Sequence, residues 1–298
     1  MPEDIRHSPE FQNFMKDLGW ETGKIDGQLI YLRKFPILGY FAKMPRPDRV
    51  PSFSKIKSYC KKKKIFQLKI SPNMTTDNVN YSGVKKQLLT SGFKIDKFPF
   101  NPTTTIYFDL KQSEENLFNS FSSAKRRGIR RASKNGIVIE ESDDFKSFEW
   151  MRWRQFGWTG FMISHEMKHL FRYFYPNYGT LLLAYQKKSP VDSDVPRTDS
   201  EKPVAGVFVI WYKHLAVYWY ASAWKIGKRL QAPSLLIWES LKLAKRKGCT
   251  VFDCDGIADS RFPEASKPWL GFTKFKEGFN GKVVEFSENF SWSKKLFR

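Results

Sequence analysis

Val251-Phe-Asp-Cys-Asp-Gly-Ile257, followed by Gly271-Phe-Thr-Lys-Phe-Lys-Glu-Gly-Phe-Asn-Gly281, is the part of the sequence that decides the fold. The first stretch predicts an apolar strand that ends in acidic residues and a glycine, and the second predicts a helix that ends in glycine. The helix carries Lys276 directly after the aromatic Phe275. A cation fixed on a rigid element beside the polar end of a strand can stabilise negative charge that develops during a reaction.

The rest of the chain repeats this alternation of strands and helices. Period-two or apolar segments predict strands at residues 29–35, 37–44, 66–70, 93–98, 104–110, 137–141, 181–185, 204–211, 215–221 and 283–286. Helical spacing and capping residues predict helices at 9–19, 50–64, 82–90, 124–135, 145–158, 165–175, 234–247 and 269–278. Two similar blocks of this kind indicate an α/β or α+β architecture with a duplicated unit.

Composition indicates a folded protein with a polyanionic partner. The chain has 298 residues, of which 41% are hydrophobic, so it can bury a substantial core. Lys and Arg number 51 against 30 Asp and Glu, which gives a formal net charge of +21. A charge of this size favours nucleic acid, a nucleotide-linked substrate or an anionic membrane surface as partner, although a generally basic proteome would also produce it.

The number and spacing of the cysteines and histidines argue against disulfide bonds and metal sites. The three cysteines have no C-x-x-C spacing, which disfavours zinc and disulfides and favours a reducing compartment. His165 and His169 are four residues apart, but no carboxylate motif accompanies them, so no metal site is predicted. The N-terminus lacks an apolar targeting segment and no apolar run is long enough to span a membrane. We therefore expect a cytoplasmic protein, with charge-driven contact to the inner face of the plasma membrane as a further option.

The stretch Lys125-Arg-Arg-Gly-Ile-Arg-Arg-Ala-Ser-Lys134 predicts a strongly basic helix. Like charges four residues apart destabilise an isolated helix by about 0.2–0.5 kcal/mol per pair. An anion that binds the helix would offset this cost, and a solvated basic face is the alternative. The candidate phosphate-binding or tRNA-binding residues are Arg126, Arg127, Arg130, Arg131 and Lys134.

The stretch Gly227-Lys-Arg-Leu-Gln-Ala-Pro233 connects a predicted strand to a predicted helix. In acyl-CoA-dependent N-acetyltransferases a glycine-rich turn at this place binds pyrophosphate through its amides. Here the turn has one early glycine and ends in a proline, which lacks an amide donor. No nucleophile–histidine arrangement, Walker loop or dinucleotide fingerprint is present, so redox and NTPase chemistry are disfavoured.

Several motifs resemble the Fem-type aminoacyltransferases (FemABX), in the order in which that family has them. The similar segments are His7 to Trp20, Ser123 to Ile139, Tyr218-Trp-Tyr-Ala-Ser222, Gln231 to Glu239, Phe252-Asp-Cys-Asp-Gly-Ile257 and residues 271–281. The resemblance extends over nearly the whole chain and is densest after residue 100.

The resemblance implies two tandem GNAT-like N-acyltransferase domains with mixed sheets flanked by helices. The first would comprise residues 1–102 plus 288–298, and the second, which carries the transfer site, residues 103–287. Some members of the family have a coiled-coil arm. We expect none here, because the only comparable insertion, residues 186–203, is short and contains prolines.

The family builds peptidoglycan cross-bridges by transferring an amino acid from aminoacyl-tRNA to a stem-peptide amine of a cell-wall precursor. The resemblance therefore implies two partners, aminoacyl-tRNA and a UDP-linked or lipid-linked muropeptide, and no cofactor beyond the tRNA donor. An acyl-CoA-dependent N-acyltransferase on the same fold and a non-catalytic basic protein that binds RNA or membranes are the alternatives.

Matching the family's motifs residue by residue gives the candidate site. The aromatic–lysine pair at the aminoacyl end of the tRNA falls on Phe275 and Lys276, and a precursor-facing tyrosine falls on Tyr220. Lys276 would stabilise the tetrahedral oxyanion formed in ester aminolysis. Asp253 and Asp255 are substrate-binding residues and candidates for the general base, because they precede Lys276 at the end of a strand. An arginine and a tyrosine with which the family contacts the precursor fall near Glu166 and Leu170, so these two contacts are not retained in this chain.

Overall fold

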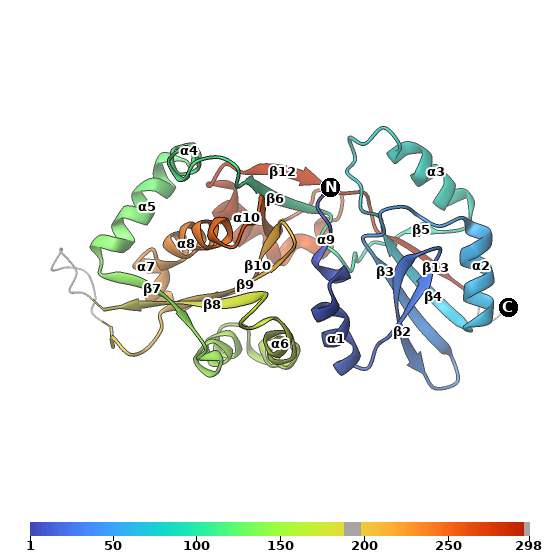
Figure 1. Cartoon of the computed structure of the whole chain (residues 1–298), viewed down its shortest axis with the longest axis horizontal. Coiled ribbons are helices and arrows are strands. Elements are labelled where there is room, and N and C mark those ends of the chain that lie inside the picture. Colours follow the sequence, from blue (N-terminus) through green and yellow to red (C-terminus); the bar gives the residue numbers. More distant parts are fainter. Residues whose placement is uncertain (188–197, 295–298) are drawn as a thin grey trace.

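The computed structural model describes residues 1–187 and 198–294, which form two mixed β-sheets side by side (Figure 1). The first sheet has six strands in the order β1-β2-β3-β4-β13-β5. Its strands are β1 (Glu21–Ile25), β2 (Gln28–Phe35), β3 (Gly39–Pro45), β4 (Ile65–Ser71), β5 (Lys94–Ile95) and β13 (Phe290–Ser293). Only β3 and β4 are parallel neighbours in this sheet, and the remaining pairs are antiparallel.

The second sheet has seven strands in the order β12-β6-β11-β10-β9-β8-β7. Its strands are β6 (Thr104–Asp109), β7 (Ile137–Ser142), β8 (Gly179–Gln186), β9 (Ala205–Tyr212), β10 (Leu215–Ala223), β11 (Val251–Gly256) and β12 (Lys282–Glu285). Here β10 and β11 are the parallel pair. Every residue of β8 is buried, as expected for a strand covered on both faces.

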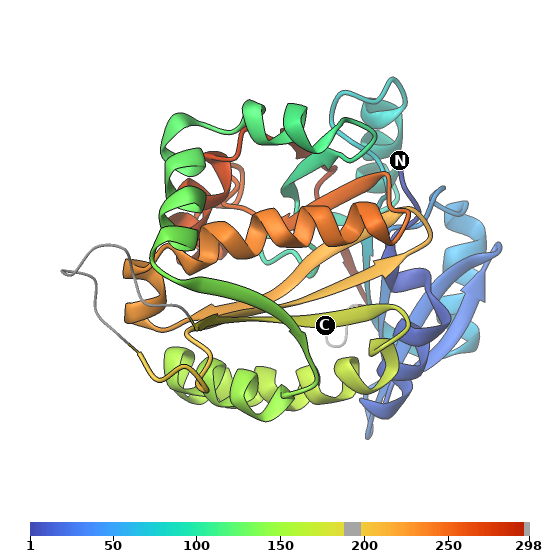
Figure 2. The same cartoon turned by 60° about the vertical axis from the view of Figure 1, so that its left-hand side comes forward.

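Helices cover both faces of the second sheet. In Figure 2, α8 (Ala232–Arg246) lies across one face and α6 (Phe145–Phe174) across the other. The α8 face also carries α4 (Glu114–Ser120), α5 (Ser123–Lys134) and α10 (Leu270–Glu277), and its core includes Phe252, Leu236 and Phe279. The shorter elements are η1 (Ile5–His7), α2 (Phe53–Lys62), α3 (Tyr81–Thr90), α7 (Lys225–Arg229), α9 (Pro263–Ser266) and η2 (Lys267–Trp269).

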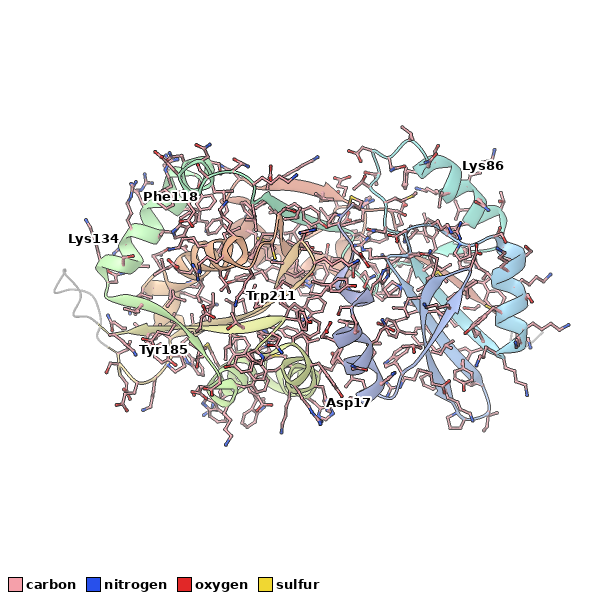
Figure 3. All side chains as sticks on the ribbon, in the orientation of Figure 1. Asp17, Lys86, Phe118, Lys134, Tyr185 and Trp211 are labelled. Carbon is pink, nitrogen blue, oxygen red and sulfur yellow. The ribbon has the colours of Figure 1, made fainter. Side chains whose placement is uncertain are left out.

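The helix α1 (Pro9–Asp17) lies between the two sheets (Figure 1). Ser8 caps it by accepting a hydrogen bond from the amide of Phe11, and a proline follows at its first position. Phe11 and Phe14 enter one apolar cluster with Phe174 of α6. Asp17, labelled in Figure 3, lies at the end of α1. It meets α6 through the ring of His169, with 3.3 Å between Oδ2 and Nδ1. The two sheets are thus joined by a shared core.

Several predicted elements need correction. The two helices predicted at 145–158 and 165–175 are parts of α6, which is interrupted at Gly157, where φ is 57° and ψ is −136°. The strand predicted at 93–98 is reduced to two residues, and β1 and β13 were not predicted at all. The absence of a coiled-coil arm depends on the insertion at 186–203, much of which lies outside the described residues. The proposed division into domains stays a prediction.

Candidate functional site

The parallel strands β10 and β11 diverge at the centre of the second sheet. They pair only from Leu215–Val217 to Val251–Asp253. Beyond that point β10 continues alongside β9, with a bulge between Tyr218 and Tyr220, while β11 follows β6, with a bulge between Asp253 and Gly256. Bulges redirect side chains and interrupt pairing. Of the predicted residues, Asp253 is the last residue of β11 that pairs with β10, and Tyr220 and Asp255 lie beyond this pairing on the diverging ends of the two strands.

Lys276 is a buried cation that is held against the end of β11. Its side chain is on α10 and the residue is 8% exposed. The ammonium donates to the carbonyl oxygens of Gly256 at 2.9 Å and Asp255 at 3.3 Å, and lies 5.0 Å from the ring centroid of Phe272. An ammonium has three N–H donors, so one remains for a ligand.

Asp253 is a carboxyl group close to Lys276 whose ionisation is suppressed. Its Oδ1 accepts hydrogen bonds from the Thr105 hydroxyl and from the amide of Asp255, the latter at 2.7 Å. Burial, with repulsion from Asp255, raises the pKa of Asp253 to about 7, although Lys276 acts in the opposite direction. A carboxylate with a pKa near neutrality is suited to general base catalysis at physiological pH.

Asp255 faces the N-terminal segment. Its φ of 61° is in the left-handed region, which few residues other than glycine adopt. Burial lowers the pKa of Arg6, but the charges of Asp4 and Asp255 outweigh this effect and raise it. The guanidinium of Arg6 also lies 5.2 Å from the ring centroid of Trp219 on β10. The N-terminal turn therefore completes the electrostatic environment of the β11 carboxylates.

Tyr220 contacts a buried arginine. The guanidinium of Arg152, on α6, lies 4.8 Å from the Tyr220 ring centroid. Burial raises the pKa of Tyr220 to about 12, and the nearby Glu166 adds to this effect, so the phenol is neutral at pH 7. A neutral phenol can both donate and accept hydrogen bonds.

Phe275 is half-buried and supports a second lysine. The ammonium of Lys125 lies 3.8 Å from the ring centroid of Phe275 and 5.1 Å from that of Phe279. Burial lowers the pKa of Lys125 to about 8. The first turn of α5 is fastened here, because the amide of Ser122 donates to the carbonyl of Gly278 at 3.1 Å. One face of Phe275 is therefore occupied by a cation.

The basic residues of α5 have two different environments. Arg127, Arg131 and Lys134 are exposed, and Figure 3 shows Lys134 at the outer end of the molecule. Arg130 is exposed and lies 5.4 Å from the ring centroid of Phe118. The guanidinium of Arg126 instead donates to two carbonyl oxygens at the end of α4, so most of the free positive charge is further along the helix.

The N-terminus of α8 is covered by α5. Gln231, which precedes α8, has a left-handed φ of 64°, and Pro233 removes one amide donor. A Cβ at Gly128 of α5 would lie 3.1 Å from the side-chain oxygen of Gln231. Ala232 and Ser234 are buried. A glycine-rich turn open to pyrophosphate is therefore missing at this described junction.

Two further observations concern alternative sites. Within residues 1–187 and 198–294, no group of three or more His, Cys, Asp or Glu side chains is arranged to hold a metal ion. A cavity of about 640 Å³ lies near the ends of β3 and β4, between residues such as Asp48, Asn73 and Asn80. None of the predicted site residues lines it.

Part of the chain is similar in sequence to a known protein family. Residues 181–296 match the model of the FemAB family. This segment holds Tyr220, Asp253, Asp255 and Lys276, and the match confirms the predicted resemblance to the Fem-type family over these residues. No curated protein sequence matches the chain.

Solved structures share the fold at low sequence identity. FemX has a TM-score of 0.75 and 16% identity, over 98% of this chain and 92% of its own. The L-PGS of Bacillus licheniformis has a TM-score of 0.56 and 14% identity, over 95% and 86% of the two chains. A tandem GNAT protein from the clavulanic acid biosynthesis pathway has a TM-score of 0.52 and 8% identity, over 89% and 78%. The predicted fold class, two mixed sheets flanked by helices in a tandem GNAT-like arrangement, is confirmed.

Four residues of the site were not predicted: Arg6, Thr105, Lys125 and Arg152. They come from η1, β6, α5 and α6, which are far apart in the sequence. Lys125 lies within the basic stretch already noted, so the sequence contained a signal for it. The other three have no local pattern, since only the folded chain brings them to β10 and β11.

Proposed function

We propose that this protein transfers an amino acid from aminoacyl-tRNA to an amine on the stem peptide of a peptidoglycan precursor. The observation that carries this proposal is the buried ammonium of Lys276, which is fixed on two backbone carbonyls with one donor to spare. Ester aminolysis generates an oxyanion, and a prepositioned cation in a desolvated site stabilises it. The FemAB segment and the FemX-like fold support the same reaction class.

The proposed reaction has a simple proton balance. The acceptor nitrogen attacks the ester carbonyl carbon, and the carbonyl oxygen becomes an oxyanion that accepts a hydrogen bond from Lys276. Asp253 takes the proton that the nitrogen loses. The bond to the ribose oxygen then breaks, and this leaving oxygen takes the proton that Asp253 holds. Both substrates are bound, so orientation supplies part of the acceleration and no further cofactor is needed.

The exposed part of the α5 stripe would contact the tRNA backbone. Arg127, Arg131 and Lys134 are free of ion pairs in the described structure and are spaced along one face of the helix. Such cations bind phosphates without sequence preference, and they make affinity strongly dependent on salt.

Removing one charge from this stripe is expected to weaken tRNA binding without slowing the chemical step. For Arg131→Ala we expect a smaller salt dependence, with the slope of log affinity against log salt concentration reduced by about one unit. Filter binding of tRNA between low and moderate salt measures this slope. Lys86→Ala on α3 is the control, because Figure 3 places Lys86 and Lys134 at opposite ends of the molecule. Equal effects of the two substitutions would contradict a role for α5.

The main alternative is acyl transfer from acyl-CoA on the same fold. The covered N-terminus of α8, with Pro233 and a side-chain oxygen of Gln231 next to Gly128, disfavours it. We expect calorimetric titration with acetyl-CoA to give no binding at micromolar concentrations. Saturable micromolar binding would favour the alternative.

The function itself is tested by product mass. Purified protein is mixed with charged tRNA and with either a UDP-linked or a lipid-linked precursor. We expect the mass of one precursor to increase by one amino-acid residue, and the comparison identifies the acceptor class. Absence of any mass gain with either precursor, while tRNA still binds, would favour a non-catalytic RNA-binding protein. No helix in the described part of the chain has the length and apolarity to cross a membrane.

A further inference from the structure

The surroundings of Tyr220 combine charges of both signs. Arg152 and Glu166 approach it from α6, and Asp255 approaches it from the diverging end of β11. One cation and two carboxylates therefore contribute to the electrostatic environment of this neutral phenol. This arrangement complements a group that carries a positive and a negative charge a short distance apart.

Arg152 is a buried cation that forms no ion pair with any side chain that the structure describes. The residue is 6% exposed, and no described carboxylate forms an ion pair with it. Its Nη1 donates to the carbonyl of Ala221 at 2.9 Å, and the rings of Tyr220 and Phe156 lie 4.8 and 5.1 Å from the guanidinium. Its Nε has no hydrogen-bond partner among the described residues. Burying an unpaired charge is costly, so a guanidinium held this way is prepared for an anion.

A second unsatisfied polar group follows Ala221, the residue whose carbonyl accepts the hydrogen bond from Arg152. Ser222 is 5% exposed, and its hydroxyl has no partner in the structure. Ser222 pairs with Gly206 across β10 and β9, and a Cβ at Gly206 would lie 3.0 Å from Phe148 of α6. Paired residues of adjacent strands face the same side, so the Ser222 hydroxyl faces the helix that carries Arg152. Two neighbouring donors are thus left without an acceptor.

We propose that Arg152 and Ser222 bind a carboxylate on the acceptor, and that the acceptor amine and this carboxylate are attached to the same carbon atom. The ammonium form of the amine would then face Glu166 and Asp255, on the way to Asp253 and Lys276. This inference rests on the proposed function and narrows its acceptor. A stem peptide that contains diaminopimelate has an amine and a carboxylate on the terminal carbon of that residue's side chain. A stem peptide that contains lysine has the amine there without the carboxylate.

The test compares these two acceptors, which differ only in that carboxylate. With the wild-type protein and aminoacyl-tRNA, we expect kcat/KM for the diaminopimelate stem to exceed that for the lysine stem by about 10- to 100-fold, the value of a charge-assisted hydrogen-bonded contact. Arg152→Gln is expected to lower kcat/KM for the diaminopimelate stem far more than for the lysine stem, and so to abolish this preference. Arg154→Gln on the same helix is the matched control, because Arg154 is exposed and packs on Trp150 instead.

The outcomes separate this inference from the proposed function. Transfer to neither stem by the wild-type protein would reject the proposed function. Transfer to both stems at equal kcat/KM would reject only the carboxylate site. This comparison uses the wild-type protein alone. If Arg152→Gln lowered kcat/KM equally on both stems, the inference would be overturned in favour of a structural role for Arg152. If that variant does not fold, Ser222→Ala is a milder substitution in the same site. A reduced preference in Ser222→Ala would support the site.

Discussion

Lys276→Ala is expected to lower kcat for aminoacyl transfer by about 100- to 1000-fold, the cost of removing one well-placed oxyanion donor. KM for both substrates should change little, since the contact forms with the transition state and is weak in the ground state. Steady-state rates at saturating substrate, with labelled aminoacyl-tRNA, measure this loss.

Two controls separate catalysis from folding in this experiment. The Lys276 ammonium also satisfies the carbonyls of Asp255 and Gly256, so its removal leaves acceptors unpaired and lowers stability as well. Lys276→Arg keeps a charged donor and should retain part of the rate. Lys274→Ala, an exposed lysine on the same helix, should behave like the wild type. Wild-type rates in a folded Lys276→Ala protein would remove the residue from the mechanism.

Asp253→Asn is expected to lower kcat/KM by about 100- to 10,000-fold at pH 8, because the amide cannot accept the amine proton. Burial and Asp255 raise the pKa of Asp253 to about 7, so the wild-type rate should rise with pH through about 7 and then level off. A pH profile of kcat/KM in the wild type and in Asp253→Asn tests this, and the variant should lose the acidic limb. An acidic limb that persists in the variant would assign it to another group.

The raised pKa of Asp253 also predicts how the stability of the fold depends on pH. The folded protein holds the Asp253 proton more tightly than the unfolded chain, whose aspartates titrate near pH 4. Between about pH 4 and pH 7 the folded state therefore binds more protons, and stability falls as pH rises. Asp253→Asn stays neutral, so it should be more stable than the wild type at pH 8 by denaturant unfolding. A destabilised variant at pH 8 would indicate that the two hydrogen bonds to Oδ1 outweigh desolvation.

The sequence predicted the elements whose apolar pattern is strong. The buried strands β8 and β9 and the amphipathic α8 were found within a few residues, because their periodicity arises directly from burial. The strand β1 was missed because only one of its five residues is buried, so no alternation is visible. The break in α6 was predicted near its place, but as a gap of several residues between two helices. In the structure the interruption is a single residue, Gly157, whose positive φ separates two helical segments.

The candidate site could be predicted only in part, for a similar reason. Phe275 and Lys276 are adjacent in one motif, and the resemblance to a family identified them. Lys276 donates hydrogen bonds to the carbonyls of Asp255 and Gly256, and this contact depends on the bulge in β11. No local sequence pattern predicts that bulge. The pairing of Arg152 with Tyr220 depends on how α6 crosses the sheet. Contacts between distant elements are set by tertiary packing, and they were not visible in the sequence.

The central claim is that Lys276 stabilises the tetrahedral oxyanion, and a stable analogue of that intermediate tests it most directly. A phosphonamidate, in which phosphorus replaces the carbonyl carbon and is bonded to both the ribose oxygen and the acceptor nitrogen, mimics the charge and the geometry of the intermediate. We predict that Lys276→Ala weakens inhibition by this analogue by the same factor as it lowers kcat, while the affinities for aminoacyl-tRNA and precursor stay the same. Equal inhibition of the wild type and Lys276→Ala would contradict the account.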